Sequence, residues 1–169
     1  MILAGIDPGL SGAVALIDAA TGAVVNIFDT PVLELKRDGK TKRELSPHSL
    51  AGALGRDRIG HAFVENVSSR PGQGVSSVFS FGKSFGITIG VLATLGIPMT
   101  FVAPQVWKKA LGVPAAKDGA RARASQLLPA AAHHWTRVRD DGRAEAALIA
   151  HYGLRMVNSI ASGAQRAAA

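Results

Sequence analysis

The sequence of 169 residues contains no cysteine, so disulfides, zinc–thiolate centres and cysteine nucleophiles are excluded. Charged residues are also few, at 18% of the chain, and aromatic residues make up 5%. Because 47% of the residues are hydrophobic, this low charge indicates a globular protein rather than a disordered one. The length predicts a single domain that is large enough for a sizeable core.

Long hydrophobic runs are absent as well. The longest, around residues 87–97, contains threonine and glycine and is shorter than the roughly 20 residues that span a bilayer. The N-terminus does not have the basic leader and long apolar core of a signal peptide, because Asp7 interrupts its first apolar run. We therefore expect a soluble, cytoplasmic protein with no membrane partner.

Negative charge is scarce relative to positive charge. Lysine and arginine together number 19 and aspartate and glutamate 12, which gives a formal net charge of +7. A basic soluble domain of this size most often binds a polyanion, and nucleic acid is the first candidate. Positive residues are dense at 34–46, where we expect a loop or an extended hairpin that either stays solvated or contacts phosphates.

Two short apolar runs that each end in a carboxylate are the most informative feature. Residues 2–6 are followed by Asp7 and by a turn that contains Pro8 and Gly9, which predicts a buried strand with Asp7 at its carboxyl end. Residues 61–65 repeat this form, with Glu65 last. Asp7 either serves only the turn, as aspartate often does, or holds a cation.

The remaining patterns predict the elements around these two strands. Further strands are expected at 13–17, 23–28 and 97–102. Helices are expected at 47–54, 75–95, 104–112, 115–128 and 140–150. This order predicts an α/β fold in which a mixed five-stranded sheet, with its first three strands in an antiparallel meander, has helices on both faces. The chain would form one domain at 1–157, followed by an Ala- and Gly-rich flexible tail at 158–169.

Four acidic residues lie at the ends of these elements and could converge: Asp7, Glu65, Asp141 and Glu145. The last two are four residues apart, which places them on one face of a helix. Clustered carboxylates repel one another unless cations neutralise them, and an all-oxygen set suits Mg²⁺ or Mn²⁺. Two such ions, about 3.5–4 Å apart, could activate water and stabilise the leaving oxygen of a phosphodiester. Alternatively, acidic residues at a helix start serve only the helix dipole.

Five short motifs follow one another along nearly the whole chain. They are IDPGLSG at 6–12, FVE at 63–65, FGKSFG at 81–86, PQVWKK at 104–109 and DGRAEA at 141–146. In this order they resemble the RuvC-type Holliday junction resolvases of the ribonuclease H-like superfamily, in particular the shorter RuvC-like proteins of phages and prophages. The resemblance implies a ribonuclease H-like fold and a homodimeric, metal-dependent endonuclease for branched DNA, with two Mg²⁺ ions (or Mn²⁺) per active site. A nucleoid-associated, phage- or prophage-encoded protein would fit this family.

The resemblance also implies which acidic residues bind metal. Asp7 and Glu65 match the first two positions of the family directly. The two late acidic residues of the family lie three apart, whereas here Gly142 stands three residues before Glu145. We therefore assign Asp141 together with Glu145, and Asp140 is the alternative to Asp141. All four assigned carboxylates are expected to be catalytic.

Basic residues are implied in the same way. Lys108, or its neighbour Lys109, and Lys117 look like the residues that approach the DNA backbone near the cut, with Lys108 also catalytic. Arg70, in the loop at 68–74, is the expected phosphate contact. Phe79 is expected to pack at the core or its rim, and stacking on a base is the alternative.

Three other interpretations of the sequence compete with the junction nuclease. Gly82-Lys83-Ser84 looks like part of a P-loop, but Ser77 stands where that motif needs glycine, so no nucleotide cofactor is expected. The alternatives within DNA processing are a nuclease with relaxed specificity for forks and flaps and a non-catalytic protein that binds branched DNA. The non-catalytic binding protein is disfavoured, because four carboxylates would only weaken binding to phosphates in a metal-free protein.

Overall fold

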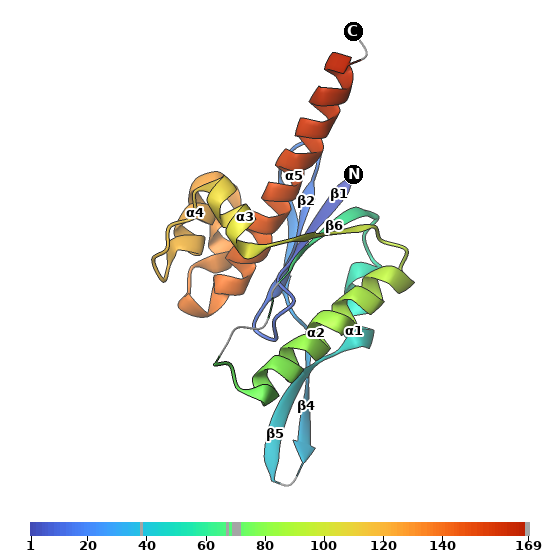
Figure 1. Cartoon of the computed structure of the whole chain (residues 1–169), viewed down its shortest axis with the longest axis vertical. Coiled ribbons are helices and arrows are strands. Elements are labelled where there is room, and N and C mark those ends of the chain that lie inside the picture. Colours follow the sequence, from blue (N-terminus) through green and yellow to red (C-terminus); the bar gives the residue numbers. More distant parts are fainter. Residues whose placement is uncertain (38, 67, 69–71, 168–169) are drawn as a thin grey trace.

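A computed structural model of the chain describes residues 1–37, 39–66, 68 and 72–167 (Figure 1). Its centre is a five-stranded sheet in the order β3-β2-β1-β6-β7. These strands are β1 (Ile2–Ile6), β2 (Ala13–Asp18), β3 (Val24–Asp29), β6 (Ile59–Glu65) and β7 (Met99–Val102). The first three are antiparallel neighbours, whereas β6 runs parallel to β1 and β7 parallel to β6. The predicted mixed sheet with its meander is confirmed.

Helices cover both faces of this sheet, as expected. One face carries α1 (Pro47–Leu54) and α2 (Val75–Thr94), and the other carries α3 (Pro104–Leu111), α4 (Gly119–Leu127) and α5 (Asp141–Ala167) (Figure 1). Two 3₁₀ segments, η1 (Pro129–Trp135) and η2 (Val138–Asp140), join α4 to α5. The helix predicted from residue 115 begins only at Gly119, which lies against Pro114 so closely that a Cβ would stand 2.1 Å from the Pro114 carbonyl oxygen.

The alternation of strand side chains divides the hydrophobic core into two layers. Leu3 and Phe63 belong to the layer under α5, whereas Ile6 and Val64 belong to the layer under α1 and α2. Because successive side chains of a strand point to opposite faces, the residues that follow Ile6 and Val64 point back toward α5. The sheet thus directs two carboxylates, at the ends of β1 and β6, to the same side.

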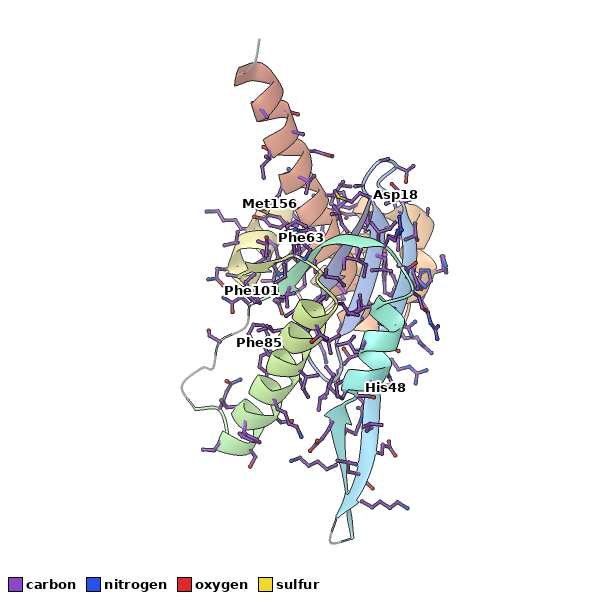
Figure 2. All side chains as sticks on the ribbon, turned by 90° about the vertical axis from the view of Figure 1, so that its right-hand side faces the viewer. Asp18, His48, Phe63, Phe85, Phe101 and Met156 are labelled. Atoms are coloured by element: carbon purple, nitrogen blue, oxygen red, sulfur yellow. The ribbon has the colours of Figure 1, made fainter. Side chains whose placement is uncertain are left out.

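Helix α5 lies directly on the middle of the sheet because the residues at the contact are small. A Cβ on Gly5 of β1 would stand 2.2 Å from the Ala146 carbonyl oxygen, and one on Gly153 would stand 2.1 Å from the Phe63 ring. Figure 2 shows Phe63 where β6 passes α5. The first turns of α5 are therefore held close to the ends of the central strands.

The last turns of α5 extend away from the sheet (Figure 1). Met156, labelled in Figure 2, still packs on the core, whereas residues 158–164 are exposed. The tail predicted at 158–169 is helical as far as residue 167, so its described part is a continuation of α5 rather than a separate segment. The domain boundary at residue 157 stays a prediction.

The basic segment at 34–46 forms the extended hairpin that the sequence allowed. Strands β4 (Val32–Arg37) and β5 (Lys40–Leu45) pair antiparallel as a separate two-stranded sheet. The hairpin projects from the molecule at the end where β1 finishes, opposite to the free end of α5 (Figure 1). Its described positive side chains, those of Lys36, Lys42 and Arg43, therefore lie at the same end of the molecule as Asp7.

Helix α2 differs from the sequence expectation of no segment long enough to span a bilayer. It has 20 residues and is apolar enough to cross a membrane by length and composition alone, and 17% of its most apolar stretch is buried. One side is anchored on the sheet: Val91 and Leu92 belong to the core, and the rings of Phe85 and Phe101 lie 5.7 Å apart (Figure 2). The opposite side is exposed to its surroundings.

Candidate active site

Asp7 and Glu65 leave the sheet at neighbouring positions. In the parallel pairing of β1 with β6, Ile6 stands opposite Val64, so the two residues that follow lie next to each other. The chain turns sharply after Asp7: its carboxylate oxygen Oδ1 accepts a hydrogen bond from the Gly9 backbone N–H at 3.1 Å. A Cβ on Gly12 would stand 2.8 Å from Asp7 Oδ2, so glycine is required beside the carboxylate. The predicted turn is present, and it orients Asp7.

Glu65 is held by a residue to which sequence reasoning gave no role. The indole Nε1–H of Trp107 donates to Glu65 Oε1 at 3.0 Å, and both side chains are buried. A buried indole N–H needs an acceptor, and a buried carboxylate needs donors, so each satisfies the other. The only signal in the sequence was the position of this tryptophan beside Lys108 in the PQVWKK motif.

The third carboxylate comes from α5 and meets a lysine from α3. Lys108 Nζ lies 2.7 Å from Glu145 Oε1 and 5.0 Å from the centre of the Trp107 ring. Lys109 and Lys117 are exposed at the surface instead. Of the two neighbouring lysines considered, Lys108 is therefore the one placed among the carboxylates.

Burial and neighbouring charges shift the pKa values of Asp7 and Glu65. Burial raises the pKa of Asp7 to about 6, and the charge of Glu145 adds to this, although the Gly9 hydrogen bond and Lys108 oppose it. Burial, together with the charges of Asp7 and Glu145, raises the pKa of Glu65 to about 7 against the opposing effects of Trp107 and Lys108. The fold thus holds three carboxylates where their charged forms need a cation.

The acidic pair at the start of α5 lies elsewhere. Asp141 Oδ1 accepts a hydrogen bond from Arg121 Nε at 2.6 Å. Asp140 is buried, and Arg137 donates to it from both its side chain and its backbone, which lowers the pKa of Asp140 to about 2. Neither residue contributes to the pKa shifts of Asp7 and Glu65. The structure brings Asp7, Glu65 and Glu145 together; the metal-binding role of Asp141 stays a prediction.

The donor chemistry of this site suits a hard divalent cation, because all the available ligands are carboxylate oxygens. Across the described residues, however, no three acidic or histidine side chains stand close enough together to hold a metal ion in the present arrangement. The ammonium group of Lys108 lies in contact with Glu145 and supplies positive charge. Binding of a divalent ion would therefore require Glu145 to exchange at least part of this contact for the metal.

The molecule has an α/β fold of the ribonuclease H-like type, with Asp7 and Glu65 at the ends of neighbouring central strands and Glu145 on α5. Among solved structures, RuvC of Thermus thermophilus in complex with a Holliday junction substrate superposes with a TM-score of 0.61 at 17% identity, covering 92% of this chain and 96% of that chain. A second T. thermophilus RuvC structure gives a TM-score of 0.54 at 19% identity with the same coverage. The chain therefore has the RuvC fold, as the motifs predicted.

The comparisons based on sequence find nothing similar: no protein-family model and no curated protein matches this chain. Arg70, the expected phosphate contact, lies outside the described residues. Phe79 was expected to pack at the core or its rim, but 69% of its surface is exposed. That expectation is wrong, because Phe79 stands near the start of α2 on the side turned away from the sheet.

Proposed function

We propose that this protein is a metal-dependent endonuclease that hydrolyses phosphodiester bonds in four-way junctions or related branched DNA. The observation that carries the proposal is the convergence of Asp7, Glu65 and Glu145 with Lys108 at the strand ends of a RuvC fold. One of the structural neighbours was solved with a Holliday junction substrate, which supports branched DNA as the partner. The proposed place of action is the nucleoid, in DNA recombination and repair.

The proposed metal ligands are Asp7, Glu65, Asp141 and Glu145, around two Mg²⁺ or Mn²⁺ ions. Bound ions would supply the Lewis acid and the activated water that phosphodiester hydrolysis needs. Trp107 keeps the Glu65 carboxylate in one orientation. Lys108 places an ammonium group where negative charge develops on the scissile phosphate. Asp141 can join only when it leaves Arg121, its present partner.

The proposed DNA contacts near the cut are basic. Lys109 and Lys117 are exposed, so they can reach backbone phosphates without leaving a structural contact of their own. Arg70 remains part of the proposal on the strength of the sequence resemblance. The exposure of Phe79 favours the alternative that it stacks on a base, since an exposed aromatic ring next to a DNA-binding loop offers a stacking surface.

We also propose a homodimer that uses the exposed side of α2. A Cβ added to Gly82, Gly86 or Gly90 would meet nothing within 4 Å, so this face is free to receive another helix at close range. A two-fold dimer would present two active sites to two opposed DNA strands. It would also cover the exposed apolar side chains that make α2 apolar enough to cross a membrane by composition.

Sedimentation analysis tests the dimer. Gly86→Glu should convert a dimer into a monomer, whereas Gly52→Glu on α1, where a Cβ also meets nothing within 4 Å, should not. A wild-type protein that sediments as a monomer at micromolar concentration would contradict the proposal.

Cleavage assays with labelled four-way junction, fork, flap and linear duplex test the activity. We expect the junction to be cut in Mg²⁺ or Mn²⁺ and left intact in chelator. Equal cutting of forks and flaps would favour the nuclease with relaxed specificity. Tight binding without cleavage in either metal would instead favour the non-catalytic binding protein.

A further inference from the structure

A second charged pocket lies next to the loop that joins β1 to β2. Six charged side chains line it: Arg43, Arg137, Arg139, Arg143, Asp29 and Asp140. They come from the β4–β5 hairpin, from the end of β3, from the segment that leads into α5 and from the first turn of α5. Four arginines against two aspartates leave this pocket with a net charge of +2. We call it the arginine pocket.

Two of its arginines are held in place by the two aspartates. Arg143 binds Asp29 through two parallel hydrogen bonds of 2.6 and 2.7 Å, and Arg137 binds Asp140 from Nε and Nη2. Such forked pairs fix the plane of each guanidinium while leaving some of its N–H groups unused. The two pairs therefore form a rigid wall whose positive charge is largely neutralised.

The other two arginines carry the free charge. Arg43 and Arg139 are exposed, and within the described residues neither forms an ion pair or a side-chain hydrogen bond. Glu34 is the cross-strand neighbour of Arg43 but forms no ion pair with it. Planar guanidinium groups match the oxygens of a phosphate better than any other side chain does. The pocket is thus built to receive a phosphate group.

The position of the pocket indicates which phosphate of a DNA strand it would receive. Gly12 lines the pocket, and a Cβ on the same residue would stand 2.8 Å from Asp7 Oδ2. A single glycine therefore separates the arginine pocket from the carboxylate site. A DNA strand whose scissile phosphate lies at Asp7 would pass over Gly12 and bring a neighbouring phosphate to the arginines.

We infer that the arginine pocket binds a backbone phosphate of the DNA strand close to the phosphodiester that is cut. This inference rests on the proposed function for the identity of its ligand. Lys108, Lys109 and Lys117 would hold the strand on the α3 side of Asp7, and the arginine pocket would hold it on the hairpin side. The basic hairpin thereby acquires a role in binding rather than being only a solvated surface.

Binding of a labelled four-way junction, measured by fluorescence anisotropy in chelator, tests the inference without using cleavage. The double variant Arg43→Gln/Arg139→Gln is compared with Arg56→Gln/Arg58→Gln, which removes the same charge from exposed arginines between α1 and β6. We expect the pocket variant to bind about 10- to 100-fold more weakly, as for the loss of charge-assisted hydrogen bonds. Its plot of log affinity against log salt should flatten by about 0.9 per lost phosphate contact. The control should change less than about twofold.

The outcomes separate this inference from the proposed function. Equal affinity of the two double variants would overturn the arginine pocket while leaving the nuclease untouched. A wild-type protein that binds the junction, cuts nothing and still needs the pocket would overturn the nuclease alone. Calorimetry with inorganic phosphate identifies a third case. In that case phosphate binds the wild type and not the pocket variant, while both proteins bind the junction with equal affinity. That result would overturn DNA as the ligand of the pocket. Thermal unfolding by circular dichroism verifies that each variant is folded.

Discussion

The loop between β1 and β2 separates two groups of charged residues whose aspartates have pKa values shifted in opposite directions. On one side the pKa of Asp7 is raised to about 6, chiefly by burial. On the other side the pKa of Asp140 is lowered to about 2, because the hydrogen bonds that Arg137 donates to it outweigh the effect of burial. Burial acts to raise the pKa of both aspartates, so the hydrogen-bonding partner decides the direction of the shift.

This difference distinguishes structural charge from functional charge. Asp140 has its cation within three residues along the chain, and the pair fixes the start of α5. Within the part of the chain that the structure describes, Asp7, Glu65 and Glu145 share one ammonium group, from Lys108. A fold that holds three carboxylates around a single positive charge is poised to gain stability when another cation binds. The predictions below test whether the two groups differ in this way.

The largest effect is expected for Asp7→Asn, which removes a charge from the under-neutralised group. Cleavage of the junction in Mg²⁺ should fall about 10³-fold or more, because the metal-dependent stabilisation of several kcal/mol is lost. Junction binding in chelator should stay equal or become tighter, since one negative charge near the phosphates disappears. Single-turnover cleavage and anisotropy measure the two effects. A variant that cuts normally would show that Asp7 is not a metal ligand.

A smaller loss is expected for Lys108→Met, with Lys109→Met as the matched control. Lys108 contacts Glu145, whereas Lys109 is exposed. Removing a positive charge beside the reacting phosphate should slow the single-turnover rate about 10²-fold. The control should weaken junction binding slightly and leave the rate of the bound complex unchanged. Equal rates for the two variants would contradict the role given to Lys108.

The pH dependence of stability should differ between the two groups as well. The pKa values of Asp7 and Glu65 are raised in the folded protein from 3.8 and 4.5 to about 6 and about 7. Over this window the folded state binds more protons than the unfolded state, so without metal the free energy of unfolding falls as the pH rises, by up to about 6 kcal/mol. The lowered pKa of Asp140 has the opposite sign, and its stabilisation is lost only as the pH falls from about 4 to about 2.

Urea denaturation at about pH 4.5 and pH 7.5, in chelator and in Mg²⁺, measures this dependence. Mg²⁺ should stabilise the protein more at the higher pH, because protons compete with the metal for the carboxylates. Asp7→Asn should remove most of the metal effect and part of the pH dependence. A free energy of unfolding that is equal at both pH values and insensitive to Mg²⁺ would show that the ionised carboxylates do not destabilise the folded protein.

The parts of this molecule that the sequence predicted are those set by local pattern. The apolar run before Asp7, the turn after it and the repeat of this form at Glu65 specify two strand ends, and parallel pairing then brings the carboxylates together. The prediction that Asp141 and Glu145 both lie at the start of one helix was correct, yet the two side chains have different partners. Arg121, on α4, binds Asp141, and no rule of spacing connects these elements.

The parts that escaped prediction depend on contacts between distant segments. Trp107 of α3 donates its hydrogen bond to Glu65 at the end of β6, 42 residues earlier in the chain. The arginine pocket joins Arg43 of the hairpin to Arg139 before α5, and neither position has a local signal beyond its charge. Phe79 was expected at the core or its rim because it is aromatic, but a helix with one buried side leaves some of its apolar residues exposed.

The smallest expected effect concerns the hydrogen bond from Trp107 to Glu65, a contact between distant segments that holds a residue predicted from local pattern. Trp107→Phe keeps the aromatic packing and removes the donor, so the folded protein should lose about 1 kcal/mol of stability. The same bond lowers the pKa of Glu65, so its loss should raise that pKa and move the acidic limb of the pH–rate profile to higher pH.

Trp135→Phe is the matched control, because Trp135 is also buried and its Nε1–H donates to Ser125 Oγ at 3.0 Å. Both variants should lose similar stability, but only Trp107→Phe should shift the pH–rate profile and reduce the cleavage rate, by about tenfold or less. Identical profiles for the two variants would mean that Trp107 supports the fold in the way that Trp135 does and does not position Glu65. A selective shift would place Trp107 with the carboxylate group, as a positioning residue.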